Sequence, residues 1–183
     1  MASPEYSEAN YVEGRRRKNS SSSFRPLVFF LVPLLSVLLD VFLPRFIESA
    51  RTLEFPLLVT IYFSLMKRQP IAGIIIGATI GLMQDSLSQQ HLGMFGIVKT
   101  MVGYFAASVS LRFDVNNPAL RFLLCTFFFV FHQFFYWVMV RALLGQAPNI
   151  NMMDELVRAL LNSAVAIPLF LLLDKLRADD SSL

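Results

Sequence analysis

The chain has 183 residues, of which 55% are hydrophobic and only 16% are charged, and its formal net charge is +3. Soluble globular domains carry about 25% charged residues, so this composition argues against a soluble domain and favours a small membrane protein with several spans. The low net charge gives no sign of a nucleic-acid partner, and the single cysteine excludes an intrachain disulfide.

The first segment, residues 1–24, is polar. Four basic residues, Arg15–Lys18, precede four serines, Ser20–Ser23. Such a segment cannot bury an apolar core, so we predict a disordered, basic and serine-rich cytoplasmic leader. The apolar run that follows, Leu27–Leu43, is longer than the core of a typical signal peptide, and it is expected to remain in the protein as the first span.

Six apolar segments follow the leader, and each is expected to form a membrane-spanning helix. They are roughly Pro26–Leu43, Leu53–Met66, Ile71–Met83, Met94–Leu111, Phe122–Val140 and Leu156–Leu173. A bilayer core needs about 20 helical residues, so the second and third segments are short and should use polar flanks, thinned membrane or cover by neighbouring helices. The sequence thus predicts an all-α, six-span membrane domain over residues 25–177, with a cytoplasmic tail at 178–183.

Basic residues are distributed unequally between the two sides of the predicted bundle. Cytoplasmic segments of multi-span proteins are enriched in lysine and arginine, so we expect both termini to be cytoplasmic. In that orientation the cytoplasmic segments carry Arg15, Arg16, Arg17, Lys18, Arg25, Lys67, Arg68, Arg112, Arg121, Lys175 and Arg177, whereas the outer segments carry only Arg45, Arg51, Arg141 and Arg158.

The third segment contains glycines at every fourth position, Gly73, Gly77 and Gly81, and we call this set the glycine stripe. In a soluble helix each glycine would cost about 1 kcal/mol relative to alanine. In a bilayer the same spacing makes a flat helix face on which another helix packs closely. Two interpretations stay open, because the second helix can belong to the same bundle or to a partner protein.

Ionisable residues inside spans are costly, so each of them is a candidate functional residue. In the predicted orientation they gather in the outer half of the bundle, and the candidates are Asp40, Asp85, Lys99, His132 and Arg158. One interpretation is an outward-facing polar cavity or docking groove. The other is ordinary pairing within the bundle, with Lys99 bound to Asp85 or Asp40 and His132 bound to a neighbouring carbonyl.

The sequence has no complete catalytic or metal-binding pattern. His91 and His132 are the only histidines, and their spacing fits no known close metal site. A nucleotide-binding glycine loop is also missing. We therefore expect a protein that is not an enzyme and that needs no cofactor.

Four short motifs resemble one known family. They are Ile61–Pro70 (IYFSLMKRQP), Gly77–Ser86 (GATIGLMQDS), Leu92-Gly93 and Gly103-Tyr104. A tyrosine-containing span that ends in basic residues, a Gly-Leu-x-x-Asp span end, a Leu-Gly loop and a Gly-Tyr helix together resemble the rod shape-determining protein MreD family. The chain departs from the family pattern at Gln84 and at residues 89–91, where smaller or apolar residues are usual.

This resemblance implies a non-enzymatic scaffold subunit of the bacterial cell-elongation machinery in the inner membrane. It implies a partner of the MreC type, whose single transmembrane helix the bundle binds, and through it the MreB filament, RodA and a class B transpeptidase, besides membrane lipids. It also implies a six-helix bundle that resembles the substrate-binding subunit of energy-coupling-factor transporters. The candidate contact residues are Gly73, Gly77, Gly81, Gly103 and Tyr104, with Gly93 as a loop candidate.

Two other functions stay open at this point. A small-ligand-binding subunit of a membrane transporter would use the outer polar cavity. An intramembrane enzyme would use Asp85, His91 and His132.

Overall fold

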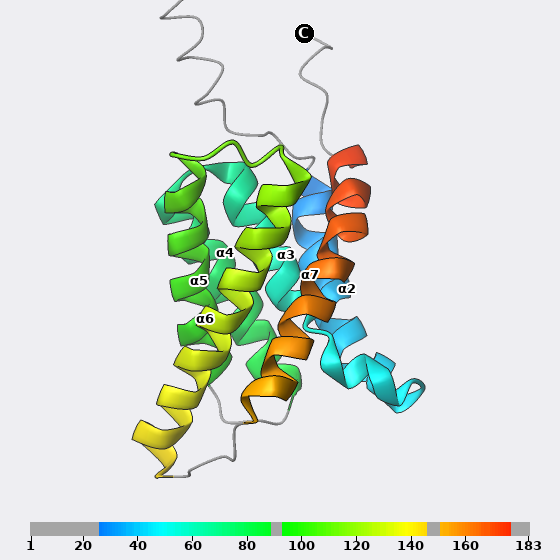
Figure 1. The fold of residues 1–183 in the computed structure, drawn as a ribbon, viewed down its shortest axis with the longest axis vertical. Coiled ribbons are helices and arrows are strands. Elements are labelled where there is room, and N and C mark those ends of the chain that lie inside the picture. Colours follow the sequence, from blue (N-terminus) through cyan, green and yellow to red (C-terminus); the bar gives the residue numbers. More distant parts are fainter. Residues whose placement is uncertain (1–25, 89–92, 146–150, 177–183) are drawn as a thin grey trace, which may run out of the picture.

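The computed structural model describes residues 26–88, 93–145 and 151–176, and within these ranges the chain contains six α-helices, two short 3-10 helices and no strand. The helices pack side by side as a bundle whose connections lie at its two ends (Figure 1). They are α2 (Pro26–Phe42), α3 (Phe55–Lys67), α4 (Pro70–Leu87), α5 (Met94–Ser110), α6 (Pro118–Leu144) and α7 (Met152–Lys175). The predicted leader and tail fall outside the described residues.

Each predicted apolar segment forms one helix, so the six-helix prediction is confirmed. Four helices, α2, α4, α6 and α7, are long and apolar enough to cross a bilayer, and α3 and α5 are shorter apolar helices. The helix α4 runs to Leu87, one turn beyond the predicted end at Met83. That last turn is polar in sequence but buried, because Gln84 and Asp85 have partners inside the bundle.

The short helix α3 lies at the centre of the bundle. All of its side chains from Pro56 to Met66 are buried, and it contacts α2, α4, α5, α6 and α7. Of the three explanations offered for its short length, cover by neighbouring helices is the one that the structure supports. A helix enclosed by protein does not have to match the thickness of the lipid around it.

The glycine stripe packs against α5 inside the bundle. A Cβ atom on Gly73 would collide with the backbone of Gly103, one on Gly77 with the backbone of Lys99, and one on Gly81 with Phe95. Glycine is therefore needed at these positions because two helix backbones meet there. The partner-interface interpretation of the stripe is wrong, and the side of α4 that faces outward carries Ile71, Ile74, Ile75 and Leu82 instead.

The last of the predicted contact residues, Tyr104, has a different position from the glycines. Its side chain is 42% exposed on the outward side of α5, where its ring packs edge-on against Phe105. A partner contact at Tyr104 stays a prediction.

The first turn of α2 and the last turn of α7 lie at the same end of the bundle (Figure 1). At this end Asp174 of α7 accepts hydrogen bonds from the Tyr62 hydroxyl of α3, at 2.9 Å, and from the Arg121 guanidinium of α6. We call it the Asp174 end and the opposite one the Glu54 end. The helices run alternately between these two ends, and the crossing of the membrane by all six of them stays a prediction.

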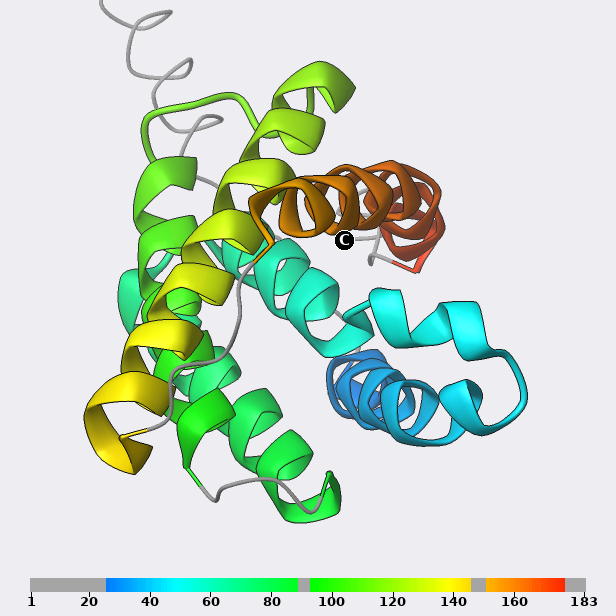
Figure 2. The same cartoon turned by 60° about the horizontal axis from the view of Figure 1, so that its bottom comes forward.

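Between α2 and α3 the chain leaves the bundle sideways at the Glu54 end (Figures 1 and 2). This segment, Leu43–Thr52, contains the 3-10 helices Leu43–Arg45 and Glu48–Thr52, and we call it the lateral arm. Its exposed side chains include Phe46 and Ile47, which are 85% and 53% exposed. Such an apolar projection beside the spanning helices is typical of a segment at the membrane interface.

Candidate functional site

A network of polar side chains lies at the Glu54 end, between α2, α4 and α5. The Gln84 side chain joins two of the predicted residues: its Nε2 donates to Asp40 Oδ2 at 2.9 Å, and its Oε1 accepts from Lys99 Nζ at 2.6 Å. The Lys99 ammonium is fully buried and lies 3.9 Å from Glu54 Oε2. The predicted gathering of Asp40 and Lys99 is therefore present, and it depends on Gln84 and Glu54.

The Lys99 ammonium also contacts an aromatic group. It lies 4.6 Å from the centre of the Phe95 ring. This ring stacks on Tyr136 at 5.0 Å and on His132 at 6.1 Å. The contact between a buried ammonium and a ring face is favourable where water is excluded, so the aromatic stack helps to stabilise the charge of Lys99.

The buried histidine has a different partner from the one predicted. His132 Nδ1 lies 3.5 Å from Glu54 Oε2, and neither ring nitrogen has a hydrogen-bond partner among the described residues. The expected carbonyl partner is thus not found there. Glu54 consequently faces both Lys99 and His132, which makes it the residue on which the inner part of the network converges.

Asp85 is not the direct partner of Lys99, so that predicted pair is corrected. Its two carboxylate oxygens accept hydrogen bonds from the backbone N–H groups of Phe95 and Gly96, at 3.1 and 2.9 Å. These N–H groups belong to the first turn of α5, where they have no partner within the helix. Asp85 therefore caps α5 from the end of α4, and Gly93, at φ 93°, makes the turn into that helix.

The cap at Asp85 gives a testable result. Asp85→Ala is expected to lower stability by about 0.5–2 kcal/mol, because it removes the acceptor for two N–H groups at a buried helix start. Asp85→Asn should lose less, since its side-chain oxygen still accepts one of the two bonds. The melting temperatures of the purified variants would check the order, and Ser86→Ala is the control because Ser86 is exposed and bonds only within α4. Equal effects of Asp85→Ala and Ser86→Ala would contradict the cap.

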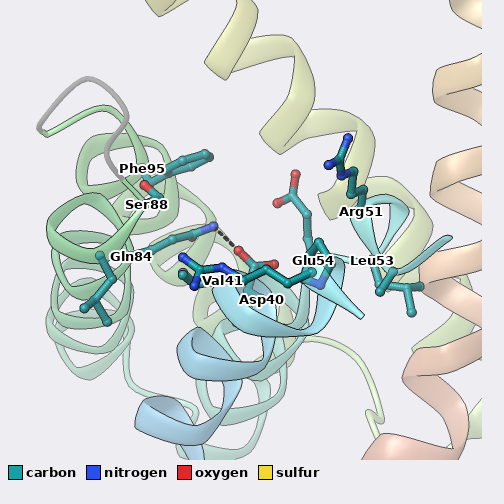
Figure 3. A pocket seen from close by; sticks show the side chains of 12 residues that line it. Asp40, Val41, Arg51, Leu53, Glu54, Gln84, Ser88 and Phe95 are labelled. Atoms are coloured by element: carbon teal, nitrogen blue, oxygen red, sulfur yellow. Dashed lines mark hydrogen bonds between the residues drawn. The ribbon is translucent and has the colours of Figure 1, made fainter. Parts of the chain in front are cut away.

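A pocket of about 410 Å³ opens beside this network (Figure 3). In the close-up, Gln84 reaches Asp40 from the α4 side, and Glu54 and Arg51 point in the same direction from the start of α3 and from the lateral arm. The pocket is lined by Asp40, Val41, Pro44, Arg45, Ala50, Arg51, Leu53, Glu54, Gln84, Leu87, Ser88 and Phe95. Its volume falls in the range of about 300–1,000 Å³ that is typical of small-molecule sites.

Arg158 forms no side-chain hydrogen bond or ion pair with the described residues of this network, although its charge acts on Glu54. Its side chain is exposed on α7, while Asn162, one turn further along the helix, is buried. The Asn162 side chain accepts from the backbone N–H of Glu54 at 2.8 Å and donates to the Thr52 carbonyl at 2.7 Å. Asn162 thus fixes the backbone that carries Glu54, whereas the predicted Arg158 acts on Glu54 through its charge alone.

Sequence reasoning missed Glu54 as a site residue. It sits at the start of an apolar segment and looks like an ordinary polar boundary residue. The sequence did single out Gln84, because this residue departs from the family pattern. His91 lies outside the described residues.

Comparison with protein families links this bundle to a known group. The model of the family described as rod shape-determining protein MreD matches residues 20–178, which is most of the chain. Comparisons with curated proteins and with solved structures gave no match. The match includes all six helices and the polar pocket, and it agrees with the motifs in α3, α4 and α5. The chain therefore belongs to the MreD family of rod shape-determining, multi-pass membrane proteins.

Proposed function

We propose that the protein is a non-enzymatic scaffold subunit of the bacterial cell-elongation complex and that it binds the transmembrane helix of an MreC-like single-span partner. Through this partner it would meet the MreB filament, RodA and a class B transpeptidase. The proposal rests on one observation: large apolar side chains are exposed on the outer surface of α2, α4, α6 and α7. Recognition by such a surface takes place within the bilayer, through close packing of helices.

The outward sides of α2 and α7 are the best candidates for the partner's position. On α2 the exposed residues recur along the whole helix, and they include Leu27, Leu31 and Leu34. On α7 they include Leu160 and Leu161, and this helix packs mainly against α6. The glycine stripe is excluded from the search because α5 covers it.

The proposed location is the bacterial inner membrane, with both termini cytoplasmic. The excess of basic residues supports this orientation, because Lys67, Arg68, Arg112, Arg121 and Lys175 all fall at or near the Asp174 end of the bundle. The pocket at the Glu54 end would then face the outer side.

Site-specific crosslinking in living cells tests the scaffold function. A photo-crosslinking amino acid would replace one exposed residue on each of four helices. The positions are Leu31 on α2, Ile75 on α4, Phe134 on α6 and Leu161 on α7. We expect one side of the bundle to crosslink to a single-span protein, and we expect depletion to make rod-shaped cells round while isolated peptidoglycan synthases stay active. Equal crosslinking at all four positions, or normal cell shape after depletion, would contradict the proposal.

A second candidate function is a small-ligand-binding subunit of a membrane transporter, which the polar pocket favours. The predicted likeness to the substrate-binding subunit of energy-coupling-factor transporters would support it, but it stays a prediction because no solved structure matched. A water-soluble small molecule that copurifies with the protein would favour this alternative over the scaffold.

A further inference from the structure

We infer that the pocket at the Glu54 end binds the head group of a zwitterionic aminophospholipid, with the ammonium group at Asp40 and Glu54 and the phosphate at Arg45 and Arg51. The inference rests on the charges of the pocket wall and on the lateral arm beside it. It does not depend on the proposed scaffold function.

The inner wall of the pocket carries more negative than positive charge. Asp40 and Glu54 both line it, and among the described residues Lys99 is the buried cation that reaches them, directly at 3.9 Å from Glu54 and through Gln84 to Asp40. The exposed Arg158 adds a smaller positive influence on Glu54. Asp85 bonds to backbone N–H groups, so Lys99 is shared between two carboxylates. Asp40 and Glu54 are both partly buried, and two such carboxylates that share one buried cation favour a second positive group, because charges withdrawn from water are stable only when paired.

Glu54 also has unused hydrogen-bonding capacity. Its Oε2 is buried and has no hydrogen-bond partner among the described residues, and the same is true of Ser88 Oγ, which lines the same pocket. Buried polar atoms in folded proteins are nearly always paired. A primary ammonium has three N–H donors, which is enough to reach Asp40, Glu54 and a hydroxyl at the same time.

The part of the wall that the lateral arm supplies has the opposite charge. Arg45 and Arg51 both come from the arm, both side chains are exposed, and neither forms an ion pair with a described carboxylate. Arginine binds phosphate through paired, charge-assisted hydrogen bonds. The pocket thus offers a cation site inside and an anion site at its rim, and a ligand that carries both charges fits it better than a simple anion or cation.

The arm explains why the ligand is a lipid. The exposed side chains of Phe46 and Ile47 follow Arg45 on the lateral arm, and the exposed Phe42 ring at the end of α2 lies 5.1 Å from the Arg45 guanidinium. Arginine and aromatic side chains on one short segment are typical of the membrane interface, where the polar heads and the acyl chains of lipids meet. A head group bound in the pocket would leave its acyl chains along this apolar surface.

The test uses the full-length protein, purified in detergent and stripped of lipid, with single lipids of identical acyl chains added back. Native mass spectrometry counts the lipids that remain bound. Phosphatidylethanolamine is expected to bind at least tenfold more tightly than phosphatidylcholine, whose ammonium has no N–H donor, and than phosphatidylglycerol, which has no cation. Equal binding of the three lipids would overturn the inference.

Two variants locate the bound lipid, and a third is their control. Arg51→Gln removes an exposed rim charge, and Asp40→Asn removes an inner charge while it keeps an acceptor for Gln84. Each is expected to weaken phosphatidylethanolamine binding about tenfold. Arg141→Gln, an exposed arginine near the outer end of α6 that does not line the pocket, should have no effect. Unchanged binding in Arg51→Gln, which is not expected to disturb folding, would overturn the assignment.

Soluble phosphoethanolamine separates a lipid from a free ligand with the same charges. The intact lipid is expected to raise the melting temperature at concentrations where phosphoethanolamine has no effect, because the acyl chains add contact with the lateral arm. If both compounds raise it equally at equal concentration, the ligand is a soluble zwitterion and the lipid assignment is wrong.

Discussion

Gly77→Leu is expected to prevent the bundle from closing, with a large loss of folded protein after purification. A side chain at this position would meet the Lys99 carbonyl and the Cα atom of Thr100, which are backbone atoms and cannot rotate away. Overpacking in a core commonly costs about 1–3 kcal/mol, and more when backbones must separate. We expect the upper end of this range, because α4 and α5 are in contact along the whole glycine stripe.

The matched control for this change lies two residues away on the same helix. Thr79 is exposed, and its hydroxyl bonds only to the Ile75 carbonyl of α4. Thr79→Leu therefore adds a similar apolar group on the outward side, where lipid accepts it. Size-exclusion profiles and melting temperatures of the two variants provide the comparison. If Gly77→Leu is as stable as Thr79→Leu, the two helix backbones are not in contact at this point.

Lys99→Met is expected to destabilise the protein by about 3–5 kcal/mol, which is the cost of removing one partner from a buried charge pair. Without the ammonium, the Gln84 oxygen loses its donor and Glu54 faces His132 with no lysine beside it. The loss should appear as a lower melting temperature of the detergent-purified protein. Lys175→Met is the control, since Lys175 is exposed at the opposite end of the bundle.

A double-mutant comparison identifies the partner of Lys99. Adding Glu54→Gln to Lys99→Met should recover part of the lost stability, because it removes the carboxylate that was left unpaired. Adding Asp85→Asn should recover less, since Asp85 binds the start of α5 and not the lysine. Residues in contact show coupling energies of about 0.5–3 kcal/mol. A larger coupling with Asp85 than with Glu54 would refute the geometry described above.

The sequence was sufficient to predict the helices, because a bilayer requires long apolar segments and each of these became one helix. The positions of Asp40 and Lys99 along their helices also follow from the count of residues, and the structure brings the two side chains together through Gln84. The direction in which each side chain points depends on how the helices rotate against each other, which no count supplies. For this reason the glycine spacing predicted a close helix contact but not that α5 makes it.

The errors at the site have physical causes of the same kind. Asp85 and Lys99 have similar depths, so charge alone suggested that they pair, yet the free N–H groups of α5 hold the Asp85 carboxylate. A helix start and a buried ammonium both need acceptors, and only the fold decides which of them a given carboxylate serves. Glu54 was missed because it precedes a helix and enters the bundle only when Asn162 fixes its backbone.

Asp174 has a consequence for the order in which the chain is made. It belongs to the last helix, yet it binds Tyr62 in α3 and Arg121 in α6. During synthesis both residues enter the membrane before the carboxylate that joins them exists, and a buried guanidinium without its carboxylate is destabilising. A chain that stops after α6 therefore lacks the residue that joins the central helix α3 to α6 at the end of the bundle.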